Sequence, residues 1–364
     1  GWRWLAEHDG DGRSLELVNT GLPNEYGQNW NASLVPEGTP GTANSVAVAN
    51  SAPLVLDVGH LPVIPRSSDT VVVTARVLDD TDGVDGLETT SSVTLSPDGS
   101  HVYATSARES AIAVFSRDAG TGVLTFVEAE FEGVAGVQGL EAAHESVLSP
   151  DGAHVYVASP GREGRVPGRV SLFHRDAATG ALSFVDAVTD DVGGVVGLDG
   201  VSSATLSPDG AHLYTTAFRD DSVVVFERGA LTGALQFAHA YVDGVDGVDG
   251  LAGATEAIVS PDGAHVYSVS IAHSFGGGEN ALVTFGRDTE TGELHFSEAL
   301  FGGVGGIDAL RQPSSVSLPF DGSLVMVTGV AANALSVFSR DAATGLLDLE
   351  EVRVDGVDCV DGLE

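Results

Sequence analysis

Apolar and polar residues alternate in short runs along most of the chain after residue 70, which is the pattern of β-strands with one buried face. The first four such runs cover residues 92–95, 101–105, 111–115 and 123–127. Ser96-Pro97-Asp98-Gly99 separates the first two runs and supplies the Pro and Gly that favour a tight hairpin turn. The pattern predicts a unit of four antiparallel strands.

This unit is repeated along the chain. Its Ser-Pro-Asp-Gly turn recurs three times and is followed by the variant Pro319-Phe320-Asp321-Gly322. The turn aspartates, 53 to 59 residues apart, are Asp98, Asp151, Asp209, Asp262 and Asp321. Four-stranded units repeated at this length are typical of a β-propeller, in which each blade covers the edges of its neighbours. The sequence therefore predicts an all-β propeller with five complete repeats, preceded by a small irregular β segment.

The repeats resemble a known family. Residues 148–156 (Leu-Ser-Pro-Asp-Gly-Ala-His-Val-Tyr) and the Val-x-x-Phe-x-Arg-Asp-x-x-Thr-Gly-x-Leu-x-Phe motif at 170–184 resemble blades of the β-propeller lactonase family, which includes 6-phosphogluconolactonase-like proteins. The resemblance covers residues 70–364 and implies a seven-bladed parent ring and a sugar lactone as substrate. Because five repeats are fewer than seven, we expect an open or strained arc from a truncated parent. Residues 71–77 either cover one edge of this arc as an extra strand or form a linker strand.

Two N-terminal segments differ from the repeats. Residues 1–46 contain all three tryptophans and resemble the last strands of a bacterial lamin-tail-like domain through segments 14–19, 28–30 and 38–44. Residues 47–69 form a linker that resembles the start of an immunoglobulin-like module. Lamin-tail-like domains occur in extracellular proteins, so the resemblance implies a secreted or cell-surface location.

Charge narrows the range of partners. The chain has 52 acidic and 16 basic residues and a net charge of −36. This excess of negative charge argues against nucleic acid and anionic membranes as partners. No apolar run has the length of a membrane helix, so membrane insertion is not expected. The single cysteine, Cys359, excludes an internal disulfide.

Residues that recur from unit to unit are expected to serve the scaffold. In an antiparallel unit the Ser-Pro-Asp-Gly turns and the third-to-fourth hairpins lie on one face, and the linkers between units lie on the other. The first face carries a histidine column (His101, His154, His212, His265) and an arginine column (Arg117, Arg175, Arg228, Arg287, Arg340). We expect each arginine to form an exposed ion pair with an aspartate on this face.

Positions at which the units differ are the candidates for function. Four and five residues after each linker Leu, three units have Ser-Ser, whereas the second has His144-Glu145 and the fourth has Thr255-Glu256. The first strand of such a blade lies innermost, so these residues should line the mouth of the channel. Glu145, Glu256 or His144 could supply a base for lactone hydrolysis, and Arg311 a cation for the oxyanion. The alternative is that these side chains are simply solvated.

The same two units carry extra residues on the linker face. These loops contain the candidate binding residues Arg162, Arg165, Arg169, His273 and Phe275. They predict a small molecule, a glycan or a protein as the partner on this face.

Acidic residues two or three positions apart are candidate Ca²⁺ ligands. They are Asp80, Asp82 and Asp85 in the first linker, and Asp9 and Asp11 near the start of the chain. Two other linkers have no acid at these positions, so ordinary solvation is the alternative. The sequence points to no other cofactor.

Three functions are open at this level. The extracellular resemblance favours a non-catalytic β-propeller region used for binding or as a scaffold. The lactonase resemblance favours a hydrolase acting on a sugar lactone. A third role, spacing other modules on a cell surface, requires no site. An unusual group of titrating residues at the channel mouth would favour the enzyme.

Overall fold

The computed structural model describes residues 86–272, 278–305 and 307–357, together with the backbone of four earlier strands. These strands are β1 (Leu15–Leu17), β2 (Trp30–Ala32), β3 (Leu54–Leu61) and β4 (Val72–Leu78). β1 pairs with β2 and β3 pairs with β4, both in antiparallel fashion. The rest of the lamin-tail-like segment lies outside the described residues.

Strands β5 to β24 form five four-stranded antiparallel sheets, called blades 1 to 5. Blade 1 contains β5 (Thr90–Leu95), β6 (His101–Ser106), β7 (Ala111–Arg117) and β8 (Leu124–Phe131). Blade 2 contains β9 (Glu145–Leu148), β10 (His154–Ser159), β11 (Arg169–Arg175) and β12 (Leu182–Thr189). Blade 3 contains β13 (Val201–Leu206), β14 (His212–Ala217), β15 (Ser222–Arg228) and β16 (Leu235–Val242).

Blade 4 contains β17 (Ala254–Val259), β18 (His265–Ser270), β19 (Ala281–Arg287) and β20 (Leu294–Phe301). Blade 5 contains β21 (Pro313–Ser317), β22 (Leu324–Gly329), β23 (Ala334–Arg340) and β24 (Leu347–Val354), with a single 3-10 turn, Val330–Ala332, after β22. In the described part of the chain, no helix has the length and apolar character needed to cross a bilayer.

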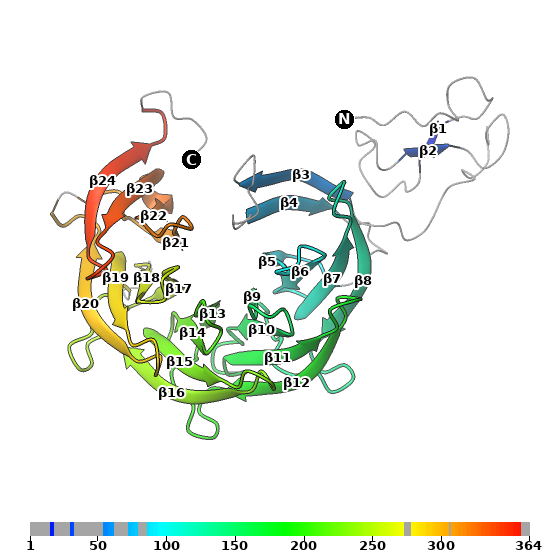
Figure 1. Ribbon diagram of the computed structural model, residues 1–364, viewed down its shortest axis with the longest axis horizontal. Coiled ribbons are helices and arrows are strands. Elements are labelled where there is room, and N and C mark those ends of the chain that lie inside the picture. Colours follow the sequence, from blue (N-terminus) through cyan, green and yellow to red (C-terminus); the bar gives the residue numbers. More distant parts are fainter. Residues whose placement is uncertain are drawn as a thin grey trace.

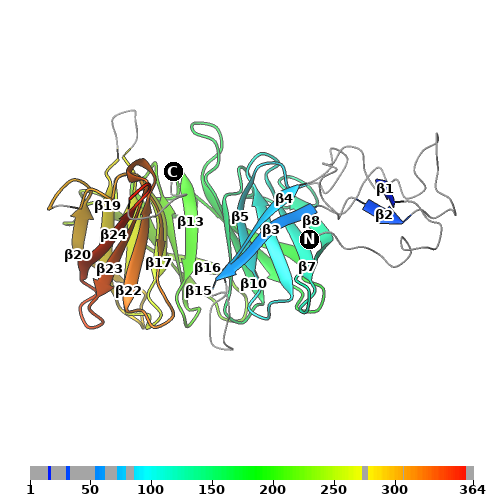
Figure 2. The same cartoon turned by 90° about the horizontal axis from the view of Figure 1, so that it is seen from above.

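The blades form an arc around a central axis, with the first strand of each blade innermost and the fourth outermost (Figure 1). This confirms the predicted all-β propeller and the predicted place of the first strands. The arc is open between blade 5 and the β3–β4 hairpin, which lies beside blade 1 (Figure 1). β1 and β2 lie to one side of the blades (Figure 2). β4 precedes Leu87 at the spacing by which β8 precedes Leu140, so it occupies the sequence position of a fourth strand.

The hydrophobic cores lie mainly between blades. Tyr214 and Val225 of blade 3 pack with Val266 and Phe285 of blade 4 in one buried cluster. Equivalent clusters join blades 1 and 2, blades 2 and 3, and blades 4 and 5. Burial of one large apolar side chain contributes roughly 1.5–3 kcal/mol, so these clusters are the main source of stability at each interface.

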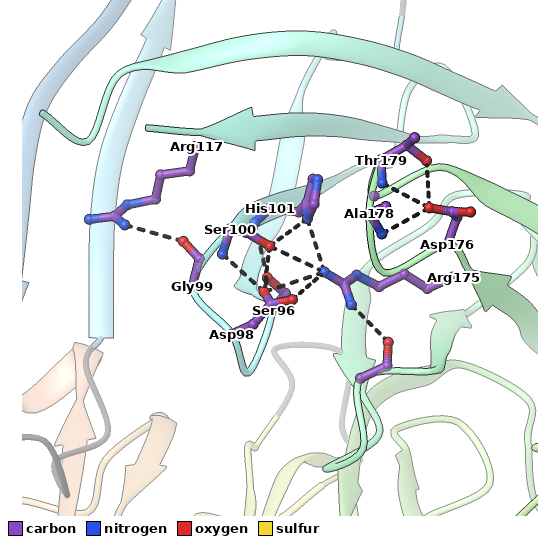
Figure 3. A network of polar contacts seen from close by, with 12 residues as sticks. Ser96, Asp98, Gly99, Ser100, His101, Arg117, Arg175, Asp176, Ala178 and Thr179 are labelled. Carbon is purple, nitrogen blue, oxygen red and sulfur yellow. Dashed lines mark hydrogen bonds and ion pairs between the residues drawn. The ribbon is translucent and has the colours of Figure 1, made fainter. Parts of the chain in front are cut away.

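A recurrent polar contact, called the latch below, joins adjacent blades on the turn face. Arg175 of blade 2 reaches Asp98 and His101 of blade 1, with Nη2 donating to Asp98 Oδ2 at 3.0 Å and to His101 Nδ1 at 2.9 Å (Figure 3). Its Nε donates to the hydroxyl of Tyr103, also in blade 1, at 2.6 Å. The Tyr103 hydroxyl donates in turn to Gly180 O of blade 2 at 2.9 Å.

The latch is repeated at the next three interfaces. Arg228, Arg287 and Arg340 contact the tyrosine and histidine of the preceding blade in the same way. The four arginines lie 2.6 to 3.9 Å from the aspartate of the preceding blade, which confirms the expected ion pairs for four of the five arginines; Arg117 has no such pair among the described residues. The expectation that these pairs are exposed is wrong for the arginines, whose side chains are 1–3% exposed, because each lies between two blades.

The latch also explains a glycine of the third-to-fourth hairpin. Gly180 has a φ of +79°, and a Cβ at this position would lie 2.2 Å from Cδ2 of His101. Only glycine allows the hairpin of one blade to lie this close to the imidazole of the preceding blade.

The two ends of the arc lack half of the latch. Leu324 and Met326 of blade 5 occupy the positions that His265 and Tyr267 occupy in blade 4. In blade 1, the Arg117 guanidinium donates to Gly99 O of its own turn, and no other hydrogen bond of it is found among the described residues (Figure 3). Complete latches therefore occur only at the four interfaces between blades.

Candidate active site

The innermost strands of the five blades line an open cavity of about 460 Å³. It is lined by both of the predicted positions in every blade, which are Ser91-Ser92, His144-Glu145, Ser202-Ser203, Thr255-Glu256 and Ser314-Ser315. Pro160, Phe218 and Ile271, from the second-to-third-strand loops of blades 2, 3 and 4, complete the lining. The structure thus brings the predicted residues Glu145, Glu256 and His144 together in one site.

The backbone aims these side chains inward. Each blade has a left-handed residue three positions before the second residue of its pair: Thr89, Ala142, Gly200, Gly253 and Gln312. In blade 4 the register of β17 against β18 then shifts between Ala254 and Glu256, and blades 1, 3 and 5 show the same irregularity. The residue left without a partner in the register is the first of the pair, and a bulge of this kind re-aims side chains.

The two glutamates also join adjacent blades. Glu145 Oε2 accepts a hydrogen bond from the Ala204 N–H of blade 3 at 3.0 Å, and Glu256 Oε2 accepts one from the Val316 N–H of blade 5 at 3.2 Å. The serines at this position in blades 1 and 3 accept equivalent bonds at 3.5 Å. Serine and glutamate therefore have the same structural role, and glutamate adds an ionisable group.

Both carboxyl groups have raised pKa values. Burial raises the pKa of Glu145 and outweighs the hydrogen bonds from the Ala204 N–H and the Ser203 hydroxyl. Burial, together with the nearby charge of Glu145, raises the pKa of Glu256 to about 7. Each side chain still contacts the cavity, since both residues are partly exposed. Glu145 in its charged form disfavours ionisation of Glu256, so the two carboxyl groups titrate as a coupled pair.

His144 has a fixed ring orientation. Its Nδ1 donates to Ser202 O of blade 3 at 2.8 Å, and its own carbonyl accepts a hydrogen bond from Thr105 Oγ1 at 2.7 Å. Since Nδ1 carries the proton, Nε2 is the acceptor nitrogen of the neutral ring. The residue is exposed and lines the cavity.

The predicted arginines of the blade 2 loop are not part of the cavity lining. Arg162 pairs with Glu141 at 2.5 Å, and Arg169 pairs with Glu132 at 3.6 Å. Arg165 is exposed. Their predicted role as binding residues for a partner of this face stays a prediction.

Arg219 is a cationic residue near the cavity that sequence reasoning missed. Its Nη1 donates to Pro160 O at 3.1 Å and pairs with Asp199 at 2.9 Å, while its guanidinium carbon lies 4.7 Å from the centre of the Phe218 ring. Arg219 therefore contacts two lining residues, Pro160 and Phe218. Its place in a linker-face loop was the signal that could have identified it. Arg311, the predicted cation for the oxyanion, is exposed and does not line the cavity.

Several predicted residues lie outside the described part of the chain. They are His273 and Phe275 of the blade 4 loop and the candidate Ca²⁺ ligands Asp9, Asp11, Asp80, Asp82 and Asp85.

One group of three acids among the described residues could hold a cation. Asp243, Asp249 and Glu279 each offer a carboxylate oxygen, and these atoms lie within 4.8 Å of one another. Burial, followed by the charges of Asp243 and Asp249, raises the pKa of Glu279. Asp243 Oδ1 also accepts the Leu251 N–H at 2.9 Å, so its position is explained by the linker turn. The oxygen donors are of the type that Ca²⁺ prefers.

Comparison with known proteins extends this description. The sequence matches the family described as lactonase, 7-bladed beta-propeller, over residues 69–190 and 130–361. A protein from Lactobacillus plantarum has a similar structure, with a TM-score of 0.59 and 18% identity over 80% of each chain. A putative 6-phosphogluconolactonase from Bacteroides uniformis gives a TM-score of 0.57 and 19% identity over 80% of this chain and 75% of its own.

A putative 6-phosphogluconolactonase from Bacteroides fragilis gives a TM-score of 0.50 and 17% identity over 85% of this chain and 96% of its own. No curated protein matches the chain. At these identities the solved structures support the fold alone. The described residues contain five blades, fewer than the seven in the family's description. Since the family match extends from before β4 to beyond β24, the chain belongs to the lactonase family of seven-bladed β-propellers.

Proposed function

We propose that the chain hydrolyses a lactone in this cavity, with Glu145 as general base and Glu256 as general acid. The observation that carries the proposal is the meeting of these two glutamates in one cavity with raised pKa values, that of Glu256 to about 7. Two carboxyl groups whose environments leave one ionised and the other protonated are suited to paired base and acid catalysis. Family membership supports the reaction class.

The first step forms the new bond. Ionised Glu145 takes a proton from a water molecule as the water oxygen attacks the lactone carbonyl carbon. The carbonyl electrons move to its oxygen, which becomes an oxyanion. Lining hydroxyls such as that of Ser91 are donors available in the cavity for this charge.

The second step breaks the ring. The oxyanion collapses, the bond between the carbonyl carbon and the ring oxygen breaks, and Glu256 gives its proton to that oxygen. The product is an open hydroxy acid. The proton on Glu145 then passes to Glu256, which restores the starting state of the pair. His144 Nε2 orients the substrate by accepting a hydrogen bond from one of its hydroxyl groups.

The test is hydrolysis of D-glucono-δ-lactone, followed by proton release at pH 6.5 after subtraction of the spontaneous rate. Loss of the base in Glu145→Gln should lower kcat/KM by about 10²–10⁴-fold. Glu256→Gln should lower it as well and remove the decline in rate that we expect of the wild type above pH 7. Glu163→Gln is the matched control, because Glu163 is an exposed acid of the blade 2 loop outside the lining, and it should retain wild-type activity.

A non-catalytic binding or scaffold role is the alternative, in which the two glutamates only tie neighbouring blades. A wild-type rate equal to the Glu145→Gln rate would support that role and refute the lactonase proposal. The secreted or cell-surface location also remains a proposal, based on the resemblance of residues 1–46.

A further inference from the structure

We infer that the cavity accepts an uncharged, polyhydroxylated lactone and discriminates against the same lactone carrying a phosphate. The inference rests on the proposed function and concerns the substrate class. It is based on which hydrogen-bonding atoms the lining presents and on the charge around them.

Four groups on the blade 2, 3 and 4 side of the lining use their own protons internally. Ser202 Oγ donates to Thr255 O at 2.9 Å, and Thr255 Oγ1 donates to Val269 O at 3.3 Å. The Ser203 hydroxyl donates to Glu145, and the His144 Nδ1–H is occupied by Ser202 O. What these groups present to the cavity is therefore mainly hydrogen-bond acceptors, namely hydroxyl lone pairs, carboxylate oxygens and an imidazole nitrogen.

An acceptor-rich lining suits hydroxyl groups, which can donate to it. A phosphate dianion has only acceptor oxygens, so at these four groups it would face acceptors, and only neutral hydroxyls such as that of Ser91 could donate to it. Burial without such partners is unfavourable for a polar group, and more so for a charged one.

The charge of the site also disfavours a phosphate group. The two acids of the lining, Glu145 and Glu256, can bring only negative charge to the cavity when they ionise. No lysine or arginine is among the lining residues described, and the undescribed blade 4 loop at 273–277 contains neither. The nearby guanidinium of Arg219 is already paired with Asp199 and bonded to Pro160 O. A phosphate would therefore be repelled without a cation to receive it.

The first experiment compares kcat/KM for D-glucono-δ-lactone and its 6-phosphate on the wild type at pH 6.5. We expect at least a tenfold preference for the uncharged lactone at low salt. The preference should narrow as salt is raised to 0.5 M, because screening weakens the repulsion of the phosphate. Equal or better use of the 6-phosphate would overturn the inference.

A charge introduced at the rim should change the preference. Ser314 is exposed at the lining, so Ser314→Arg places a cation beside the cavity without filling a buried position. It should shift the ratio of kcat/KM toward the 6-phosphate by at least tenfold. Ser314→Gln, which adds length without charge, should leave the ratio unchanged, and an equal shift in both variants would contradict the charge argument.

A binding measurement separates this inference from the proposed function. D-gluconolactam and its 6-phosphate resist hydrolysis, and calorimetric titration gives their Kd values on the wild type. If neither lactone is hydrolysed faster than by Glu145→Gln but the lactam binds at least tenfold more tightly than its 6-phosphate, the lactonase proposal fails and the ligand class stands. Equal binding of the two lactams, or binding of neither, overturns the ligand class.

Discussion

Two sets of hydrogen bonds join neighbouring blades, one on the turn face and one at the channel mouth. The latch uses the same four residue types at every internal interface, as in the contact of Arg228 with Tyr156 and His154. The channel-mouth set alternates, with serine in blades 1, 3 and 5 and glutamate at Glu145 and Glu256. Both sets perform the same mechanical task, so the difference between them points to a second task at the channel mouth.

The two sets also respond to pH in opposite directions. Burial alone would raise the pKa of Asp151, but hydrogen bonds from Ser149, the Ala153 N–H and Arg228 lower it to about 2. Among the described residues no cation compensates for the burial of Glu256, whose pKa is raised to about 7. The turn face thus keeps its carboxylates ionised, whereas the channel mouth keeps a proton, which is what acid–base catalysis needs.

Making the channel-mouth set uniform should have the largest effect. The double change Glu145→Ser and Glu256→Ser gives all five blades the same residue, and the serines of blades 1 and 3 already make the equivalent inter-blade bond. We expect kcat/KM for lactone hydrolysis to fall by about 10²–10⁴-fold, while the cooperative thermal transition is kept. An active double variant would show that the alternation has no catalytic meaning.

Breaking a latch should act on stability instead. Arg228→Ala leaves the buried Tyr156 hydroxyl without its donor, which should cost about 1–3 kcal/mol in the free energy of unfolding. The Asp151 carboxylate, which is half exposed, should add little to this cost. Arg117→Ala in blade 1 should cost about 1 kcal/mol or less, because its described partner is a single carbonyl. Urea denaturation measures both. Equal costs would mean that the inter-blade contacts of the latch add nothing.

The pH dependence of stability should separate the two sets. Glu256 has a pKa of about 7 in the folded protein and of about 4.3 in the unfolded chain. Its contribution to the stability of the fold is therefore complete below pH 4 and is lost as the pH rises through 7. The loss of folding free energy is about 4 kcal/mol. Asp151, with a folded pKa of about 2, contributes stability above pH 4 that is lost as the pH falls through 2.

Thermal unfolding at pH 5 and pH 8 checks this expectation. Glu256→Gln should reduce the fall in Tm between these two values, and Asp151→Asn should lower Tm by the same amount at both. A wild-type Tm that does not fall between pH 5 and pH 8, or a fall that Glu256→Gln leaves unchanged, would contradict the raised pKa of Glu256.

The smallest expected effect compares one position in two blades. Tyr214→Phe removes a hydroxyl that Arg287 Nε donates to and that donates to Gly292 O, which should cost about 1–3 kcal/mol. Met326→Leu, at the same position of blade 5, should change stability by less than about 1.5 kcal/mol, since it replaces one apolar side chain by another of similar volume. Differential scanning calorimetry resolves the two. A larger loss of stability for Met326→Leu than for Tyr214→Phe would indicate that Met326 has a specific partner on the side of blade 5 that faces away from blade 4.

Much of the fold could be predicted because it depends on short-range sequence features. Turn chemistry and alternation gave the four strands of each unit, and antiparallel order then placed Glu145 and Glu256 at the same end of the molecule. The latch could not be predicted in detail, because Arg175 meets Tyr103 across 72 residues and their contact depends on how two blades rotate against each other. For the same reason the arginines were expected at the surface, although they are buried.

The site was predicted where it depends on strand position and missed where it depends on loop shape. Both residues of each innermost pair line the cavity as expected. Phe218, Pro160 and Ile271 were missed because each lies just beyond a strand end, where the path of a loop determines what it faces. Arg311 was chosen for its place in a linker, but a residue at the start of a linker-face turn need not face the axis.

The contacts of the latch are directional along the chain. Each internal blade carries an arginine that inserts into the preceding blade and a histidine–tyrosine pair that receives the arginine of the following one. A copy of any internal blade could therefore be inserted at an internal junction and would find both of its contacts already present. A copy placed after blade 5 would bring an arginine to Leu324 and Met326, which cannot accept its hydrogen bonds. Duplication can thus lengthen this protein from within at little cost, whereas growth beyond blade 5 requires new residues on its outer face.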